Sequence, residues 1–448
     1  MRATHARTGL VDRSCDVAVV GAGTAGLAAE RAARKAGAKT LLIDDAFAGT
    51  TCANVGCMPS KLLIAAANAA FDARGASIFG IQTETTVDDR AVMARVRKER
   101  DGFVSTTLKS IENLPAGICI RQRAHFVGET RLALDDGSAV TAKTIVIATG
   151  SRPSIPTPFS GLGDILVTNE TIFELPALPR SIAVIGAGPL GLELAQALAR
   201  LGVDIKVFDE GERLAALRDA EVAKNLRSVL GREFPIHLGV KVEIEEQGGQ
   251  ARLSWSGDSS GEATFERVLV AAGRPPALHE LSLKASGLLT NEHGVPKFDP
   301  ATLQCGDAPF LAGDVDGQRA VLHEAYAEGA IAGRNAALFP NVEKAKRSVP
   351  LAIMFTDPPL ATIGASPSDV MVVGSSSYVD QGRAKVEART LGSSASTAIE
   401  AEASSRGHVS SGLGWTTSPI CSPGQSSGEK RPPLFCNFRS TIRRSRKV

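Results

Sequence analysis

The stretch GTTCANVGCMPSK, at residues 49–61, holds two cysteines directly before a helix-forming run. Cys52 and Cys57 have four residues between them, and the run LLIAAA follows at residues 62–67. The start of a helix offers unpaired backbone N–H groups and the positive end of the helix dipole, which favour a thiolate over a thiol. The pattern therefore predicts a redox-active disulfide between Cys52 and Cys57.

Two plainer interpretations of these cysteines stay open on spacing alone. A metal site would need a second group of cysteines or histidines at suitable spacing, and the sequence has none. Two unrelated buried cysteines would also fit. The segments on both sides favour the redox interpretation, and we predict no metal site.

Length and composition set outer limits on the protein. A chain of 448 residues has room for two to four domains with their own cores. No run of about eighteen apolar residues occurs, so we expect no transmembrane helix. The first thirteen residues lack the apolar centre of a secretory signal, and Cys15, Cys119 and Cys305 are isolated from one another. We therefore expect a reducing, cytoplasmic setting.

The net charge of +2 is unevenly distributed. Residues 393–448 contain eight Lys or Arg against three Asp or Glu, which leaves 42 basic against 45 acidic residues in residues 1–392. The main body shows no basic face of the kind that binds nucleic acid, and we expect no nucleic-acid partner.

A dinucleotide-binding motif follows the first predicted strand. The apolar run DVAVV, at residues 16–20, leads into GAGTAG and then into an alanine-rich helix. In this order the first glycine allows a tight turn, the second lets a pyrophosphate approach, and the third lets the helix pack closely. The next strand ends in an acid placed to bind a ribose hydroxyl. The residues concerned are Gly21, Gly23, Gly26 and Asp44.

The same pattern occurs a second time. The run SIAVI, at residues 181–185, leads into GAGPLG and a helix, and the following strand ends in Asp209. Two dinucleotide motifs in one chain imply two cofactors. A carboxylate at Asp209 favours NAD over NADP, whose extra phosphate would meet a negative charge, although Arg213 keeps NADP open. The glycines of this second turn are Gly186, Gly188 and Gly191.

Three later strand ends carry related turns. ATGSRP, at residues 148–153, is echoed by AAGRP at residues 271–275. A further strand ends in Gly-Asp, at residues 313–314, before a helix predicted over residues 321–338. Asp314 alone could also be a helix cap or a turn acid, which is the less favoured interpretation.

Together these residues resemble the pyridine-nucleotide disulfide oxidoreductases, most closely the dihydrolipoamide dehydrogenases. The resemblance runs from about Cys15 to about Arg389, with the motifs in the family's order. It implies an α/β fold of two Rossmann-like dinucleotide-binding domains, for FAD and NAD, followed by an α+β interface domain that forms a homodimer in the family and that we expect to be incomplete in this chain. The implied division is a disordered N-terminus at 1–13, the FAD-binding domain at 14–155 and 275–347, the NAD-binding domain at 156–274, the start of the dimerisation domain at 348–392, and an aberrant, disordered tail at 393–448.

The resemblance also implies roles for single residues. Cys52 would exchange with the substrate and Cys57 would lie against the flavin, while Lys61 and Glu193 would pair near the flavin N5. Without the resemblance, Glu193 could equally be a solvated helix residue. Gly21, Gly23, Gly26, Asp44 and Asp314 would bind FAD, Gly186, Gly188, Gly191 and Asp209 would bind NAD, and Thr51, Lys61, Thr149, Gly150 and Gly273 complete the predicted cofactor-binding set.

The chain departs from the family pattern at two places. Before the cysteine motif the family has two glycines, whereas here the order is Gly49-Thr50, a change that should not prevent the chemistry. The family also ends in a His-Pro-Thr…Glu motif that serves the partner subunit as acid and base, and this sequence has no such motif. Residues 393–448 contain 13 serines and little periodicity, which indicates disorder.

A change of reading frame would explain this tail. Codons for residues 437–448, read one nucleotide earlier, permit the peptide LPFYHPTIEEG with suitable third bases. The hypothesis places a frameshift near residues 390–392, and the DNA sequence decides it. His408, the one histidine of the tail, is a poor candidate for the missing base, because geometry rather than residue type makes a base.

The expected function is a FAD-dependent dithiol/disulfide oxidoreductase that passes electrons between a dithiol such as dihydrolipoamide, the cysteine pair, FAD and NAD. Its partner would be a small dithiol or disulfide, or a lipoyl domain. Mercuric reductase is an alternative within the class, although Cys421 and Cys436 are badly spaced for the extra cysteine pair of that family. A diaphorase or an inactive flavoprotein is a second alternative, because the substrate-side base is missing.

Overall fold

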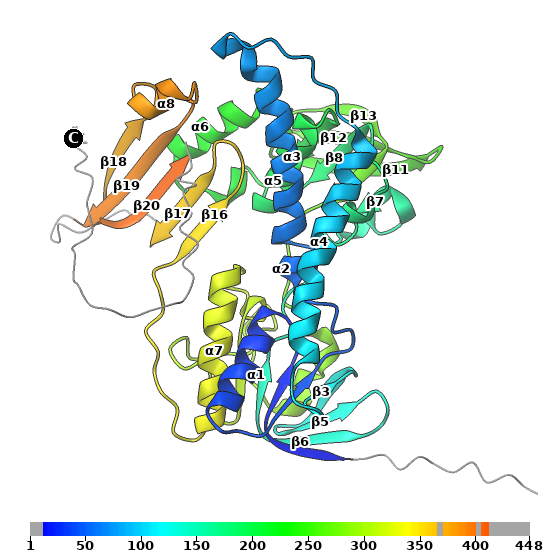
Figure 1. Cartoon of the computed structure of the whole chain (residues 1–448), viewed down its shortest axis with the longest axis vertical. Coiled ribbons are helices and arrows are strands. Elements are labelled where there is room, and N and C mark those ends of the chain that lie inside the picture. Colours follow the sequence, from blue (N-terminus) through cyan, green and yellow to red (C-terminus); the bar gives the residue numbers. More distant parts are fainter. Residues whose placement is uncertain (1–11, 365–370, 400–404, 412–448) are drawn as a thin grey trace, which may run out of the picture.

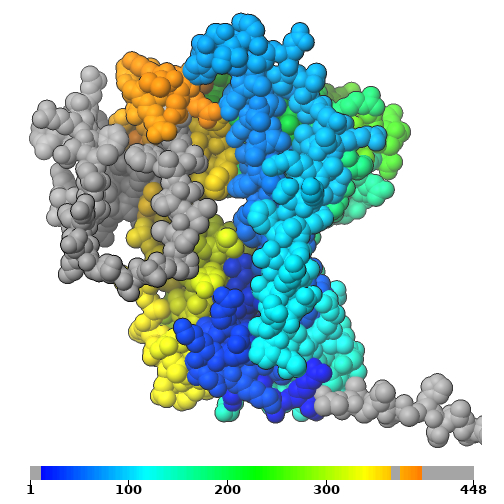
Figure 2. Space-filling model, in the orientation of Figure 1, coloured from blue at the N-terminus to red at the C-terminus, as the bar shows by residue number. Residues whose placement is uncertain are grey.

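The computed structural model describes residues 12–364, 371–399 and 405–411 of the 448-residue chain (Figure 1). It is a mixed α/β protein with two domains built on largely parallel sheets, a three-stranded antiparallel sheet in the second domain and a C-terminal antiparallel sheet. In the space-filling view a narrow waist separates the lower half, which contains the N-terminal β-sheet, from the upper half (Figure 2). The predicted fold class is confirmed.

The first domain is built on a sheet in the order β3-β2-β1-β6-β5-β4, with β15 paired to β6. Its buried apolar strands run parallel at the centre, as expected for a sheet that is covered on its faces. The chain leaves this domain and returns to it, because β15 lies far along the sequence. The strands are β1 (Arg13–Val20), β2 (Thr40–Ile43), β3 (Cys119–Ile120), β4 (Ala124–Gly128), β5 (Arg131–Leu134), β6 (Ala139–Ile147) and β15 (Pro309–Leu311).

Two helices from opposite ends of the sequence pack together in this domain. α1 (Thr24–Lys35) and α7 (Leu322–Leu338) approach closely because α7 carries Gly329 and Gly333 at the contact. A Cβ at Gly329 would lie 2.1 Å from the Ala25 carbonyl oxygen, and one at Gly333 would lie 2.1 Å from that of Ala29. Only glycine allows this approach.

The predicted disordered N-terminus at 1–13 includes two residues that the structure describes: β1 begins at Arg13, and Asp12 accepts a hydrogen bond from the Ala139 N–H at 3.0 Å. Pairing with β6 extends the strand beyond its apolar run. Residues 1–11 lie outside the described residues.

The second domain repeats the parallel arrangement in the order β10-β9-β8-β14-β7. An antiparallel meander follows its fourth strand along the chain. The elements are β7 (Leu166–Val167), β8 (Ser181–Ile185), α5 (Pro189–Arg200), β9 (Asp204–Phe208), α6 (Ala220–Leu230), β10 (Ile236–His237), β11 (Val240–Gln247), β12 (Gln250–Gly257), β13 (Gly261–Phe265) and β14 (Arg267–Val270).

Three helices join the two domains. α2 (Thr51–Asn54) and α3 (Cys57–Gly75) carry the cysteines, and α4 (Asp89–Glu112) runs beside α3 across the waist (Figure 1). One helical stretch, residues 51–79, meets the length and hydropathy of a membrane span. We interpret it as a helix of the protein body, because Leu63 and Ala67 are buried in a core shared with α5. Short 3-10 turns lie at Ala76–Phe79, Thr157–Phe159, Gly163–Ile165, Ile172–Glu174, Leu214–Ala216, His279–Leu281, Leu283–Ser286 and Asp314–Asp316.

The C-terminal part is more complete than the sequence indicated. Its sheet has the order β16-β17-β20-β19-β18, and neighbouring strands are antiparallel. The predicted disorder is wrong for the last two strands, because backbone pairing with β17 and β18 needs no apolar periodicity. Residues 400–404 and 412–448, with Cys421, Cys436 and the segment of the proposed alternative frame, lie outside the described residues. The elements are β16 (Leu351–Met354), β17 (Leu360–Gly364), β18 (Met371–Ser377), α8 (Gly382–Val386), β19 (Ser393–Ile399) and β20 (Ser405–Ser411).

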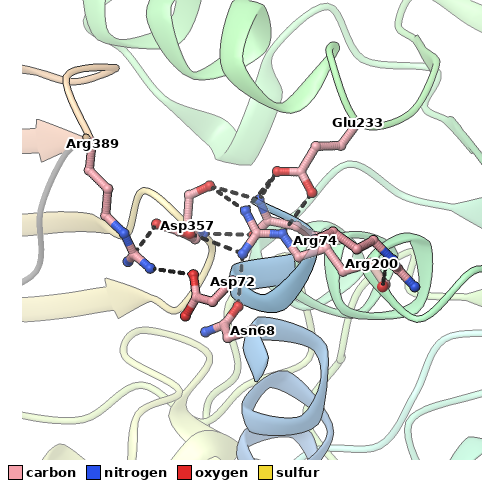
Figure 3. A network of polar contacts seen from close by, with 8 residues as sticks. Asn68, Asp72, Arg74, Arg200, Glu233, Asp357 and Arg389 are labelled. Carbon is pink, nitrogen blue, oxygen red and sulfur yellow. Dashed lines mark hydrogen bonds and ion pairs between the residues drawn. The ribbon is translucent and has the colours of Figure 1, made fainter. Parts of the chain in front are cut away.

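Arg200, at the end of α5, joins three parts of the chain (Figure 3). Its side chain is 4% exposed. It lies 2.7 Å from a Glu233 carboxylate oxygen and 3.0 Å from one of Asp357, and it donates to Asn68 on α3 at 2.8 Å. Arg389 extends the cluster, at 3.6 Å from Asp357. The buried guanidinium therefore fixes the C-terminal sheet against both α3 and α5.

Removal of this guanidinium should destabilise the protein. Arg200→Met leaves two partly buried carboxylates without their partner, and we expect a loss of about 3 kcal/mol of unfolding free energy. Arg252→Met is the matched control, because Arg252 pairs with Glu262 at an exposed site, where about 0.5 kcal/mol is typical. Thermal and urea unfolding measure both, and equal losses would contradict the assignment.

Candidate active site

A cavity of about 760 Å³ lies where the first domain, α3, α5 and the C-terminal sheet meet. Both cysteines open into it, together with the first residues of α1 and α5. Eight of the residues singled out in the sequence line this cavity, namely Gly23, Thr51, Cys52, Cys57, Lys61, Gly150, Glu193 and Asp314.

The two cysteines belong to different helices. Cys57 is the first residue of α3, as expected, but Cys52 lies in the separate one-turn helix α2. The turn between them needs glycine, because a Cβ at Gly56 would lie 2.9 Å from the Thr51 carbonyl oxygen. Both cysteines are thiols in the structure.

The cysteine pair is electrostatically asymmetric. The pKa of Cys57 is lowered from 9.0 to about 7, chiefly by a hydrogen bond from the Cys52 thiol and also by the nearby Lys61 ammonium, while burial and the Glu193 carboxylate oppose the shift. The same hydrogen bond raises the pKa of Cys52, and burial adds to this. Cys57 is therefore the more acidic thiol of the pair.

Lys61 and Glu193 form an ion pair beside the cysteines. Lys61 Nζ lies 2.6 Å from Glu193 Oε2, which is the pairing that the family resemblance implied. Glu193 is 6% exposed, and its second oxygen accepts a hydrogen bond from the Phe355 N–H at 2.7 Å. Lys61 Nζ also lies 4.1 Å from the centre of the Phe355 ring. Glu193 is therefore not a solvated helix residue but a buried bridge between α3, α5 and β16.

The first glycine turn fits a dinucleotide such as FAD. A Cβ at Gly21 would lie 2.4 Å from the Ala148 carbonyl oxygen, and one at Gly26 would lie 1.8 Å from that of Gly21. Gly23 faces open space at the start of α1, where a phosphate can reach backbone N–H groups. Thr149 Oγ1 is buried without a hydrogen-bond partner, so it is available to a ligand.

Two acids of the first domain have different positions. Asp44 accepts hydrogen bonds from the N–H groups of Ala22 at 2.8 Å, Ala46 at 3.0 Å and Phe47 at 2.7 Å, so its carboxylate holds the glycine turn. Asp314 lines the cavity and accepts a hydrogen bond from Ser151 Oγ at 3.1 Å.

The second glycine turn repeats the geometry of the first. A Cβ at Gly186 would lie 2.4 Å from the Ala271 carbonyl oxygen, and one at Gly191 would lie 2.1 Å from that of Gly186. Gly188 and Asp209 line a second hollow, which also contains Arg213 and Arg218.

Asp209 has the place in this turn that Asp44 has in the first. Its carboxylate accepts hydrogen bonds from Ala187 at 2.6 Å and from Gly211 at 2.7 Å. Gly273 follows β14, and its carbonyl oxygen accepts a hydrogen bond from the Ser154 N–H at 2.9 Å. The second turn therefore fits a second dinucleotide, at the start of α5.

The chain belongs to the pyridine nucleotide-disulphide oxidoreductase family, whose model matches residues 15–329. The protein is therefore an oxidoreductase of the FAD-dependent disulfide class, with a nicotinamide dinucleotide as its second cofactor.

Curated relatives and solved structures fit this family. The chain is 30% identical over 400 residues to dihydrolipoyl dehydrogenase 2 of Haloarcula marismortui, a match that covers 86% of this chain and 83% of that protein. It is 30% identical over 363 residues to a mercuric reductase of Staphylococcus aureus, covering 79% of this chain and 65% of that one. The HOCl-induced flavoprotein disulfide reductase RclA from Escherichia coli, solved as a Cu(II) complex, shares the fold with a TM-score of 0.76 at 21% identity, over 90% of each chain.

Sequence reasoning missed several residues around the cavity. Phe355, whose N–H and ring contact the ion pair, carries no motif that could reveal it. Asn169 and Arg274 also line the cavity. The similarity between the motifs ATGSRP and AAGRP could have pointed to Arg274 as a site residue, but no sequence motif marks Asn169.

The asymmetry of the thiols gives a pH prediction. In the reduced protein, alkylation of Cys57 should rise with pH through a midpoint near 7, because the thiolate is the nucleophile. Cys52→Ala removes the thiol that donates to Cys57, so the midpoint should rise toward 9.0. Tandem mass spectrometry of the peptide after iodoacetamide treatment at several pH values measures the midpoint. A midpoint for unaltered Cys57 near 9 would refute the asymmetry.

Proposed function

We propose that the protein is an NAD-linked dithiol/disulfide oxidoreductase that acts on a small dithiol such as dihydrolipoamide, free or on a lipoyl domain. The observation that carries the proposal is the joint lining of one cavity by the cysteine pair, the Lys61–Glu193 ion pair and the glycine turn of the first domain. The 30% identity to dihydrolipoyl dehydrogenases supports the substrate class.

The cysteines exchange electrons with the substrate by thiol–disulfide exchange. A substrate thiolate attacks Cys52 Sγ in the oxidised pair, the Cys52–Cys57 bond breaks, and Cys57 leaves as a thiolate. The second substrate thiol then displaces Cys52, which yields the substrate disulfide and the reduced pair. Of the groups that lower the pKa of Cys57, the Cys52 thiol donates its hydrogen bond only in the reduced pair, whereas the Lys61 ammonium also favours Cys57 as the leaving thiolate in the disulfide. When Cys52 is displaced from the mixed disulfide it takes up a proton, which its raised pKa favours.

The remaining residues hold the cofactors. FAD, held by the Gly21–Gly26 turn and Asp314, would supply the two-electron transfer between the cysteine pair and the nicotinamide. Lys61, fixed by Glu193, presents a positive charge to the cavity beside Cys57. In total, the dithiol and NAD⁺ give the disulfide, NADH and one proton.

Deprotonation of the dithiol substrate is the weak step in this chain. The sequence lacks the family's C-terminal His-Pro-Thr…Glu motif, and loss of a general base typically slows a reaction by about 10² to 10⁴. His408 lies in β20, where its backbone is paired with Ile363. The group that deprotonates the dithiol is the acid of the reverse reaction, so we propose that lipoamide turnover is slow in both directions, while NADH reduction of free acceptors is unaffected.

We further propose a homodimer in the cytoplasm. Ile78 is 68% exposed and Phe79 is 60% exposed beyond α3, and Ile353 on β16 is 45% exposed. Exposed apolar groups of this kind support contact with a second subunit. The described cysteines are all free thiols, which fits a reducing compartment.

We infer a preference for NAD from Asp209. Its carboxylate would meet the extra phosphate of NADP, although Arg213 and Arg218 line the same hollow. Asp209→Ser should raise the ratio of kcat/KM for NADPH over NADH about tenfold, equivalent to about 1.4 kcal/mol. The assay is NADH- or NADPH-dependent quinone reduction, with Asp204→Ser at the other end of β9 as the control. An unchanged ratio would overturn the preference.

A second candidate is a diaphorase that passes NADH electrons to free acceptors, which the missing acid/base motif favours. Mercury reduction is an outcome to be tested beside it, since the chain is also similar to a mercuric reductase. Among the described residues, no group of three or more His, Cys, Asp or Glu side chains is arranged to hold a metal ion.

A comparison of acceptors separates these functions. Cys52→Ser and Cys57→Ser should each lower NADH-dependent lipoamide reduction by at least about a thousandfold, because the nucleophile is lost, and should leave quinone reduction largely intact. Cys119→Ser is the control, because Cys119 is an exposed free thiol that does not line the cavity. Quinone reduction without lipoamide reduction by the unaltered protein would favour the diaphorase. NADPH- or NADH-dependent loss of Hg²⁺ would favour the mercuric reductase.

A further inference from the structure

A chain of polar contacts connects the turn between the two cysteines with the segment that holds Asp314. Asn169 Nδ2 donates a hydrogen bond to the Val55 carbonyl oxygen at 2.9 Å. Val55 is the C-terminal cap of α2, so its carbonyl oxygen is one that the helix leaves without an internal partner. Asn169 comes from the turn after β7, in the second domain, and is 3% exposed.

Arg274 holds Asn169 in this orientation. Arg274 Nη1 donates to Asn169 Oδ1 at 2.8 Å, which leaves the amide nitrogen to face Val55. The other two hydrogen bonds of Arg274 go to Ser151, to the carbonyl oxygen at 2.8 Å and to Oγ at 3.2 Å. Ser151 Oγ in turn donates to Asp314 Oδ2 at 3.1 Å.

The row of polar contacts rests on the two segments in which the polypeptide passes from one domain to the other. Residues 150–154 and 273–277 pair through backbone hydrogen bonds from Arg152 N to the Pro275 oxygen at 3.1 Å and from Ala277 N to the Gly150 oxygen at 2.9 Å. These crossings contain the two echoed motifs. Arg274 is thereby placed on a fixed backbone, and its planar guanidinium reaches Ser151 and Asn169 at once.

We propose that Asn169 is a positioning residue for the cysteine pair, which holds the Cys52–Cys57 turn through Val55 while Arg274 and Ser151 tie it to Asp314. The inference rests on the proposed redox role of the two cysteines. The turn has two residues, Val55 and Gly56, between the helices that carry the thiols. Any shift of α2 relative to α3 therefore changes the hydrogen bond from Cys52 to Cys57.

This role predicts the direction in which the pKa of Cys57 changes when Asn169 is lost. The hydrogen bond from Cys52 is the main cause of the lowered pKa of Cys57, so a looser turn should raise that pKa. The other charged groups near Cys57 are Lys61 and Glu193, whose hydrogen bonds go to each other and to the Phe355 N–H, whereas those of Asn169 go to Val55 and Arg274. Loss of Asn169 therefore acts on the thiol through the turn.

The test is the pH profile of Cys57 alkylation in the reduced, flavin-free full chain, read by tandem mass spectrometry. In Asn169→Ala the midpoint should rise, and alkylation at pH 7 should be about fivefold slower, as for a thiolate fraction whose pKa rises by one unit. Asn169→Leu keeps the volume of the side chain and removes both hydrogen bonds, so it should give the same shift if the alanine variant folds poorly. Arg274→Met should shift the midpoint in the same direction by less.

The control is Asn335→Ala, which removes an equally buried asparagine amide that donates to the Thr302 carbonyl oxygen, away from the cavity. This variant loses a comparable buried hydrogen bond, so it should lower the stability of the protein without moving the midpoint of Cys57 alkylation. If Asn169→Ala and Asn169→Leu keep the midpoint of the control, the positioning role is wrong. The measurement needs no turnover, so a protein that fails to reduce lipoamide but shows the shift would disprove the proposed function and leave this inference standing.

Discussion

The site depends on the ion pair between Lys61 and Glu193. Lys61 belongs to the helix that begins with Cys57, and Glu193 belongs to the helix that begins at the second glycine turn. A charge pair with one partner almost fully buried is stable only if its geometry is good and its other hydrogen bonds are satisfied. The Phe355 N–H satisfies the second oxygen of Glu193, so the C-terminal sheet is required for the pair as well.

Three side chains on one face of α5 contact the C-terminal segment. Glu193, Gln196 and Arg200 are spaced so that they lie on one side of the helix. Gln196 exchanges hydrogen bonds with the backbone of Asp357, at 2.7 Å in each direction, and Arg200 binds the Asp357 side chain. On α3, Lys61 and Asn68 face Glu193 and Arg200 with the same separation of seven residues. The contacts of α3 and α5 with each other and with the C-terminal segment therefore fix how the two helices are aligned. This alignment places the Lys61 ammonium beside the cysteine pair.

The two nucleotide turns show how backbone sterics produce a repeated site. In each turn, the first and third glycines lie where a side chain would collide with a carbonyl oxygen, and the second glycine faces open space. The acids that follow, Asp44 and Asp209, both accept a hydrogen bond from the residue after the first glycine. Their carboxylates thus stabilise the turn. This constraint is local, which explains why a short motif predicts it well.

The sequence alone determined the features that depend on local backbone geometry: the family, the α/β class, both glycine turns, the cysteine pair and the helix at residues 322–338. It could not reveal Asn169, Phe355 or Arg200, because each of these acts on a residue more than a hundred positions away in the chain. It also predicted disorder for residues 393–399 and 405–411, since strand pairing by backbone hydrogen bonds leaves little trace in side-chain pattern. Tertiary structure decided which thiol carries the charge, because that depends on how α2 and α3 are placed relative to each other and to Lys61, and non-local packing sets this placement.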